Sequence, residues 1–194
     1  MDFIKSNFLQ TSRLIDSFIN NQIEVDKLDN LMRILADKHK NGFKGLTCGN
    51  GGSACDAMHY AEELTGRFQK NRPAMAAISL TDSSHITCVA NDYGFDQIFS
   101  RGVEALGKAG DYLIAISTSG NSQNVIKAVE VAKQMDILTI GLLGKDGGKL
   151  KNMTDFSFVF DAKTSDRIQE LHIILIHTLI EGIERELHPE NYLT

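Results

Sequence analysis

The sequence predicts an α/β fold: a doubly wound parallel five-stranded sheet with two extra N-terminal helices. From residue 45 onward, short apolar runs of strand length alternate with amphipathic segments of helix length. Strands that alternate with helices typically form a parallel sheet covered on both faces. Before residue 42, apolar residues recur at three- and four-residue spacing, which is the helical period.

The two N-terminal helices are expected over residues 2–21 and 24–40. Leu28, Leu31 and Leu35 show the helical spacing in the second segment. The pair Asn41-Gly42 then provides a typical helix C-terminus, because glycine readily adopts the left-handed conformation that ends a helix.

Five buried strands and four helices are expected after this pair. The strands are the runs GLTC, MAAISL, DYLIAIS, ILTIGLL and FSFVF, at 45–48, 75–80, 111–117, 137–143 and 156–160. The helices are expected over 53–67, 94–107, 121–134 and 164–187. The sequence contains no low-complexity linker and no repeat, so we expect residues 1–194 to form a single domain, with 1–41 as an N-terminal helical extension.

Composition argues against several classes of protein. The net charge is −5 and the sequence pI is about 5.7, whereas nucleic-acid binders usually carry a basic stripe. The three cysteines are odd in number and lack CxxC spacing, which is typical of reduced thiols. The longest apolar run, 173–180, is too short to cross a bilayer. We therefore expect a cytoplasmic protein with no nucleic-acid or membrane partner.

The loop after the first expected strand, residues 48–53, reads CGNGGS. With Ala54 it fits the G-x-G-x-x-A pattern of dinucleotide-binding proteins, but no acidic residue ends a second strand at the usual distance of about 20 residues. A tight turn without a ligand is the other alternative. Glycines let the backbone approach a ligand closely, and Ser53 is expected to cap the following helix.

The loop after the third expected strand, residues 117–122, reads STSGNS. Its four hydroxyls and its glycine precede a helix, where side-chain donors and free backbone N–H groups can together bind an anion. Simple N-capping would need only one of these hydroxyls. The loop lacks the Gly-Lys-Ser/Thr of a nucleotide-binding P-loop, which favours a sugar phosphate as the anion.

Polar residues at helical spacing indicate a metal or acid/base site. His59 and Glu63 are four residues apart and share one helix face. Gln169 and His177 lie in a second row, beside an apolar stripe, where burial without partners would cost about 1–3 kcal/mol each. His172, next to this row, is a candidate core or interface histidine. Two such pairs could ligate one divalent ion, and their nitrogen and oxygen donors suit zinc, nickel, cobalt, iron or manganese.

Several long motifs together resemble the phosphoheptose isomerases of the sugar-isomerase (SIS) domain superfamily, whose fold is flavodoxin-like. The motifs are CGNGGSACDAMHYAEELTGRF (48–68), Asn91-Asp92 in CVANDYGF, STSGNSQNVIKA (117–128), KDGGKL (145–150) and DRIQELHIILIH (166–177). They occur in the family's order and at its spacing.

The resemblance implies a set of site residues. One Zn²⁺ per subunit would be held by His59, Glu63, Gln169 and His177. Arg67 and Asp166 would lie in the polar shell around the substrate site. The residues that bind the substrate would be Asn50, Gly51, Gly52, Ser53, Glu63, Asn91, Asp92, Ser117, Thr118, Ser119, Ser122 and Gln169.

The resemblance also implies an activity and an assembly. Family members convert D-sedoheptulose 7-phosphate into D-glycero-D-manno-heptose 7-phosphate, the first step towards the ADP-heptose of lipopolysaccharide core. Moving a carbonyl from C2 to C1 through an enediol needs a base and an acid, and we assign Glu63 and His177 to these roles. Family members are homotetramers with sites shared between subunits, and the two N-terminal helices are candidate packing elements.

Two further hypotheses rest on the same fold. The first is a non-catalytic SIS-domain binding protein that acts on the replication initiator. Such relatives share the serine-rich loop but lack the full acid/base set, so the presence of Glu63 and His177 favours an enzyme. The second is a sugar-phosphate-sensing regulator, but the chain shows no attached DNA-binding segment and no basic patch.

Overall fold

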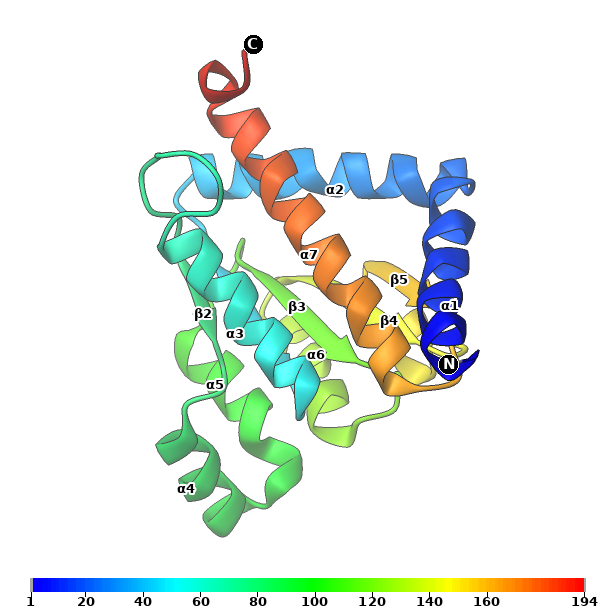
Figure 1. The fold of residues 1–194 in the computed structure, drawn as a ribbon. Helices are drawn as coiled ribbons and strands as arrows, with labels where there is room; N and C mark the ends of the chain where they lie inside the picture. The colour runs from blue at the N-terminus through cyan, green and yellow to red at the C-terminus, as the bar shows by residue number, and fades with distance from the viewer. Residues whose placement is uncertain (1, 194) are drawn as a thin grey trace.

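The computed structural model describes residues 2–193 and contains one parallel sheet with helices on both faces (Figure 1). The strand order is β2-β1-β3-β4-β5, and all the pairings are parallel. The strands are β1 (Gly45–Gly49), β2 (Ala77–Ser79), β3 (Tyr112–Ser117), β4 (Leu138–Gly144) and β5 (Phe156–Phe160). The predicted doubly wound five-stranded fold is confirmed.

Within residues 2–193 the chain forms seven α-helices, and two of them precede the sheet as predicted. They are α1 (Asp2–Ile19), α2 (Gln22–Lys40), α3 (Gly52–Thr65), α4 (Ser83–Tyr93), α5 (Ile98–Leu106), α6 (Gln123–Gln134) and α7 (Ser165–Leu187). Short 3₁₀ turns are η1 (Phe95–Gln97), η2 (Lys149–Asn152) and η3 (Pro189–Tyr192). None of the described helices combines the length and the apolar content that crossing a membrane requires.

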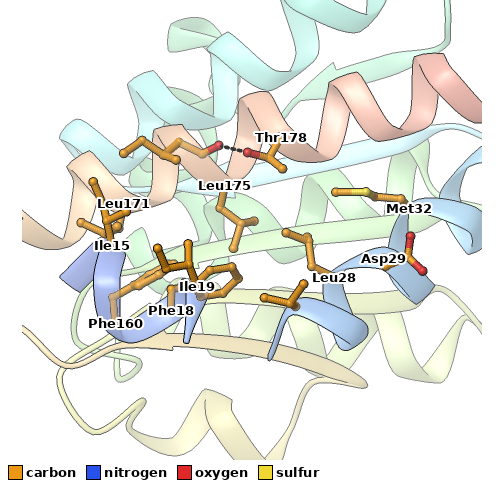
Figure 2. Close-up of a pocket in the computed structure, with 12 residues that line it drawn as sticks. Ile15, Phe18, Ile19, Leu28, Asp29, Met32, Phe160, Leu171, Leu175 and Thr178 are labelled. Carbon is orange, nitrogen blue, oxygen red and sulfur yellow. Dashed lines mark hydrogen bonds between the residues drawn. The ribbon is translucent and has the colours of Figure 1, made fainter. Parts of the chain in front are cut away.

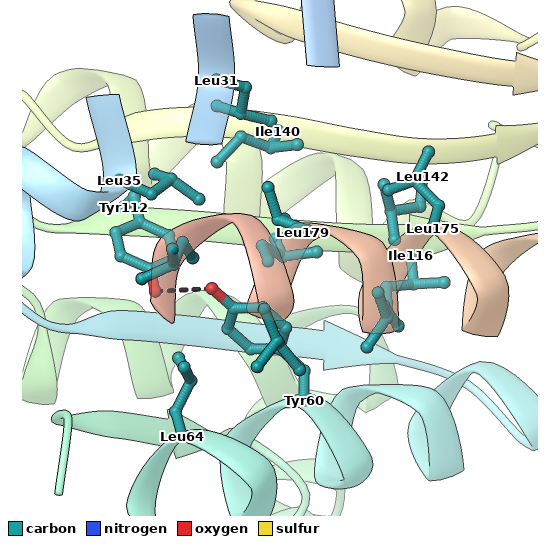
Figure 3. Close-up of a cluster of buried hydrophobic side chains, with 14 of the residues drawn as sticks. Leu31, Leu35, Tyr60, Leu64, Tyr112, Ile116, Ile140, Leu142, Leu175 and Leu179 are labelled. Atoms are coloured by element: carbon teal, nitrogen blue, oxygen red, sulfur yellow. Dashed lines mark hydrogen bonds between the residues drawn. The ribbon is translucent and has the colours of Figure 1, made fainter. Parts of the chain in front are cut away.

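The sheet separates two hydrophobic cores, because successive side chains of a strand point to opposite faces. In β3, Tyr112, Ile114 and Ile116 pack with α2, α3 and α7, whereas Leu113 and Ala115 pack with α5 and α6. Figure 3 shows the first core, where the buried hydroxyls of Tyr60 and Tyr112 are hydrogen-bonded at 2.7 Å. Burial on both faces explains why the strands are almost wholly apolar.

Three local features differ from the prediction. Residues 83–93 form α4, which was not expected, and the helix expected over 94–107 is divided into η1 and α5 after Gly94, whose φ is +91°. Among the residues of α4 only Val89 is buried, so its apolar period is weak. Ser53 does not cap α3, because the helix begins one residue earlier, after Gly51, and Ser53 is buried in its first turn.

The topology places the two motif loops side by side. Strands β1 and β3 are neighbours, and the helices that follow them lie on opposite faces of the sheet. The position between two such strands is the topological switch point of the sheet. Ligands of doubly wound proteins bind there, outside the carboxyl ends of the strands. The glycine-rich loop follows β1 and the serine-rich loop follows β3, so both lie at this position.

Candidate active site

Three candidate side chains from α3 and α7 converge. The Nε2 atom of His59 lies 2.9 Å from Nε2 of His177 and 3.3 Å from Oε1 of Glu63. One ligand atom from each of the three residues can be chosen so that all lie within 4.8 Å of one another. The four-residue spacing on α3 and the packing of α3 against α7 bring these groups together.

The two helices that carry the cluster run side by side in the same direction (Figure 1). Near their N-terminal ends, the Gln169 carboxamide donates to Oγ of Ser53 at 3.4 Å. Two turns further along, His177 meets His59. A methyl group added at Gly52 would lie 2.6 Å from the carboxamide atoms of Gln169, so glycine at this position makes the close approach possible.

The sequence interpretation missed two residues beside the cluster. The ring of Phe68 stacks on the ring of His177, with centroids 5.7 Å apart. Asp56 lies one turn before His59, and its Oδ2 is buried without a hydrogen-bond partner among the described residues. Burial raises the pKa of Asp56 to about 6, against the opposing effect of His59. Asp56 lies three residues before His59, a helix-face spacing that could have pointed to it.

The serine-rich loop presents hydroxyls at the start of α6. Ser117 and Ser122 pair through their Oγ atoms at 3.0 Å, and Oγ of Ser119 accepts from the backbone N–H of Asn121 at 3.1 Å. The hydroxyl of Ser122, at the N-cap, makes no capping bond to the helix. The loop therefore contains more hydroxyls than helix capping uses.

Two contacts tie this loop to its neighbours. Asn50 and Asn124 exchange two amide hydrogen bonds of 2.9 Å, which join the glycine-rich loop to the first turn of α6. Thr118 and Ser165 pair through their hydroxyls at 3.1 Å, which places the start of α7 beside the serine-rich loop. Candidate substrate residues from three separate segments are thus brought together.

The remaining candidate residues lie on the surface. Asn91 and Asp92 are exposed in the last turn of α4, and Asn91 donates to Asp92 at 2.7 Å. Arg67 is exposed just after α3. Asp166 is exposed in the first turn of α7, where hydrogen bonds from Thr164 and then Arg167 lower its pKa to about 2. Among the described residues, no hydrogen bond joins these four to the His59–Glu63–His177 cluster.

The donor set of the cluster fits a divalent metal ion. Two imidazole nitrogens and a carboxylate oxygen converge within 4.8 Å of one another, and all three are atom types that first-row divalent ions bind. Such a set is typical of zinc, although other first-row ions accept it. The histidine and carboxylate side chains of this set are His59, Glu63 and His177, and the carboxamide of Gln169 donates to Ser53.

Comparisons with known proteins decide the family. The family model for the SIS domain matches residues 8–144. The phosphoheptose isomerase of Fusobacterium nucleatum is 56% identical over 188 residues, which cover 97% of each chain. The chain belongs to the phosphoheptose isomerase family. The prediction of a sugar-phosphate isomerase, made from the motifs alone, is thereby confirmed.

Solved structures of phosphoheptose isomerases share the fold. The enzyme from Francisella tularensis superposes with a TM-score of 0.90 at 36% identity, over 95% of this chain and 97% of that one. The enzyme GmhA from Neisseria gonorrhoeae gives a TM-score of 0.87 at 41% identity, over 94% and 97% of the two chains. These comparisons lend no support to the alternative of a non-catalytic partner of the replication initiator.

Proposed function

We propose that this chain isomerises D-sedoheptulose 7-phosphate to D-glycero-D-manno-heptose 7-phosphate through an enediol. The observation that carries the proposal is the convergence of His59, Glu63 and His177 in a chain more than half identical to a phosphoheptose isomerase. By the same likeness, the product would serve as the precursor of ADP-heptose for lipopolysaccharide core.

The two strand-to-helix loops would bind the phosphate and the hydroxyls of the sugar. The hydroxyls of Ser117, Thr118, Ser119 and Ser122 and the first turn of α6 suit a phosphate. The glycine-rich loop lies beside them and is held there by Asn50. We assign the substrate site to the set already proposed from the family, in which Arg67 and Asp166 form the surrounding polar shell and the other residues contact the substrate: Asn50, Gly51, Gly52, Ser53, Glu63, Asn91, Asp92, Ser117, Thr118, Ser119, Ser122 and Gln169.

Proton transfer is assigned to Glu63 and His177. The Glu63 side chain is only 16% exposed, which shields its carboxylate from water. As the base, it would take a proton from C1 of the ketose, and reprotonation at C2 would give the aldose. His177 is fixed between His59 and the ring of Phe68, so its imidazole is positioned to exchange a proton with a substrate oxygen.

We propose Zn²⁺ as the cofactor, one ion per subunit, with Gln169 as a fourth ligand as the family resemblance implies. The chain's own donors for it are His59, Glu63 and His177. When bound, the ion would supply Lewis-acid polarisation of the substrate oxygens at C1 and C2.

We propose a homotetramer with sites at subunit interfaces. Helix α1 buries none of its residues within the protomer. A hollow of about 370 Å³ opens between α1, α2 and α7, and its apolar lining is drawn in Figure 2. Large apolar side chains are also exposed along α1 and at the start of α2, and exposed apolar surface is typical of protein interfaces; they are Phe3, Ile4, Phe8, Leu9, Ile19 and Ile23. Light scattering would test the assembly, and a monomer at micromolar concentration would refute it.

We also propose a domain organisation and a cellular location for the protein. Residues 1–194 form one SIS domain, with 1–41 as an N-terminal extension used in packing. The protein works in the cytoplasm without nucleic-acid or membrane partners, which its three free cysteines, Cys48, Cys55 and Cys88, support.

Turnover of sedoheptulose 7-phosphate by the purified protein tests the function. The Glu63→Gln and His177→Gln variants should fold but lose at least 100-fold in kcat, because general acid–base catalysis contributes about 10²–10⁴-fold. The matched control is Glu104→Gln, since Glu104 is a carboxylate of α5, on the opposite face of the sheet, whose side chain is 47% exposed. Wild-type protein that stays inactive with Zn²⁺ supplied would refute the proposal, as would full activity of the Glu63→Gln variant.

A further inference from the structure

Arg72 follows α3 and has a fully buried side chain, with 0% exposed. Its Nη2 donates to the backbone carbonyl of Glu63 at 2.6 Å, and its Nη1 donates to the carbonyl of Leu64 at 2.7 Å. A longer bond of 3.3 Å reaches the carbonyl of Gly66. The last carbonyls of a helix have no intrahelical partner, so the guanidinium supplies hydrogen bonds to the free carbonyls in the last turn of α3. It also places a positive charge at the negative end of the dipole of α3.

The same guanidinium also binds α7. Its Nε donates to Oε1 of Glu184 at 2.7 Å, and the Glu184 side chain is only 1% exposed. The other oxygen of Glu184 accepts from the hydroxyl of Tyr192 at 2.8 Å. Glu184 lies seven residues after His177, on the same side of α7 and about 10 Å further along the helix axis. One buried side chain therefore connects the backbone of Glu63 to the helix that carries His177.

We propose that Arg72 is a positioning residue that sets the register of α3 against α7 and thereby holds His59, Glu63 and His177 at ligand and proton-transfer distances. This inference rests on the proposed function of the cluster. Arg72 bonds to the main chain of Glu63 itself, so a shift of the guanidinium moves the backbone from which that carboxylate extends.

The N-terminal ends of the two helices are joined less tightly. There the hydrogen bond between Gln169 and Ser53 is 3.4 Å long, whereas the bonds of Arg72 to Glu63, Leu64 and Glu184 are 2.6–2.7 Å. Only arginine offers a planar fork of five donors that can reach two carbonyls and a carboxylate together. Lysine would keep the charge but lose the simultaneous contacts.

A set of variants separates positioning from simple stability. Arg72→Met leaves Glu184 as an unpaired buried charge, which should lower the melting temperature strongly. The double variant Arg72→Met/Glu184→Met removes both charges and should recover part of that loss, because the hydrogen bonds to the carbonyls of α3 stay missing. The matched control, Arg101→Met/Glu104→Met, removes an exposed ion pair of the same residue types from α5, on the opposite face of the sheet. Arg72→Lys provides a second test should the double variant not fold.

Three quantities are measured for each variant: the melting temperature of the metal-free protein, Zn²⁺ affinity by calorimetric titration, and kcat and KM with sedoheptulose 7-phosphate. For the double variant we expect Zn²⁺ affinity and kcat each at least 10-fold below wild type and KM within threefold, despite the partly recovered melting temperature. Arg72→Lys should show the same losses, and the exposed-pair control should match wild type.

Two results would overturn the inference alone: a double variant with wild-type Zn²⁺ affinity and kcat, or Arg72→Lys with both unchanged. Wild-type protein that neither binds Zn²⁺ nor isomerises the substrate would instead overturn the proposed function, and this inference with it. The wild-type arm therefore distinguishes the two failures.

Discussion

His172 should make the stability of the protein depend on pH. Its imidazole is 0% exposed, and burial lowers its pKa from 6.5 to about 4. The Nε2–H donates to the carbonyl of Leu143 at 3.1 Å, whereas Nδ1 is buried without a partner in the described chain. A proton added at Nδ1 would therefore have no acceptor, and the native state keeps the ring neutral.

The sign and size of the effect follow from the two pKa values. An unfolded chain binds a proton at His172 below about pH 6.5, whereas the folded chain binds one only near pH 4. Above pH 6.5 the neutral His172 ring does not reduce the free energy of unfolding. As the pH falls towards 4, protonation of the unfolded chain at His172 lowers this free energy progressively. Between pH 8 and pH 5 this single group should cost about 2 kcal/mol of unfolding free energy.

The contribution of His172 to the pH dependence of the unfolding free energy can be measured by urea unfolding. Wild type and a His172→Gln variant are compared at equal protein concentration from pH 8 to pH 5. Glutamine can still donate to Leu143 but does not titrate. Other shifted groups, such as His39, whose pKa burial lowers to about 4, are common to both proteins and cancel in the difference. The variant should lose about 2 kcal/mol less than wild type over this range. Equal losses in the two proteins would refute the reasoning.

Three other perturbations have defined outcomes. In Gly52→Ala the new methyl displaces the Gln169 carboxamide. We expect at least a 10-fold loss of kcat/KM with an unchanged melting temperature. Wild-type kinetics would argue against a role for Gln169. In Gly120→Ala the methyl overlaps the carbonyl of Gly147 at a φ of +62°, so unfolding free energy should fall by about 2 kcal/mol or more in chemical denaturation; a loss below 0.5 kcal/mol would contradict this. Removing metal with a chelator should lower the melting temperature and adding Zn²⁺ should restore it; no response to either would count against the metal site.

The sheet and most helices could be predicted from the sequence because their patterns are strong and local. Strand β3 is a continuous apolar run, and the apolar stripe of α7 places Ile168, Leu171, Leu175 and Leu179 in the core. Helix α4 could not be predicted in this way, since Val89 is its one buried residue and Ile86 and Ala90 are only partly buried against the core.

The site could be predicted only in part. The spacing of His59 and Glu63 and the polar row ending in His177 pointed to the cluster, because helical periodicity relates residues near in sequence. Arg72 and Glu184 carry no such signal. They are 112 residues apart, and only the packing of α3 against α7 pairs them. Asp56 has a helix-face spacing from His59, but that its Oδ2 is buried without a partner among the described residues is known only from the structure.

The most direct test of the central claim is proton NMR of sedoheptulose 7-phosphate incubated with the wild-type protein and Zn²⁺ in D₂O. Removal of a proton from C1 by Glu63 and return of a proton to C2 predict an aldose heptose 7-phosphate that carries solvent deuterium at C2. Failure of any aldose signal to develop, or an aldose wholly without deuterium at C2, would contradict the account.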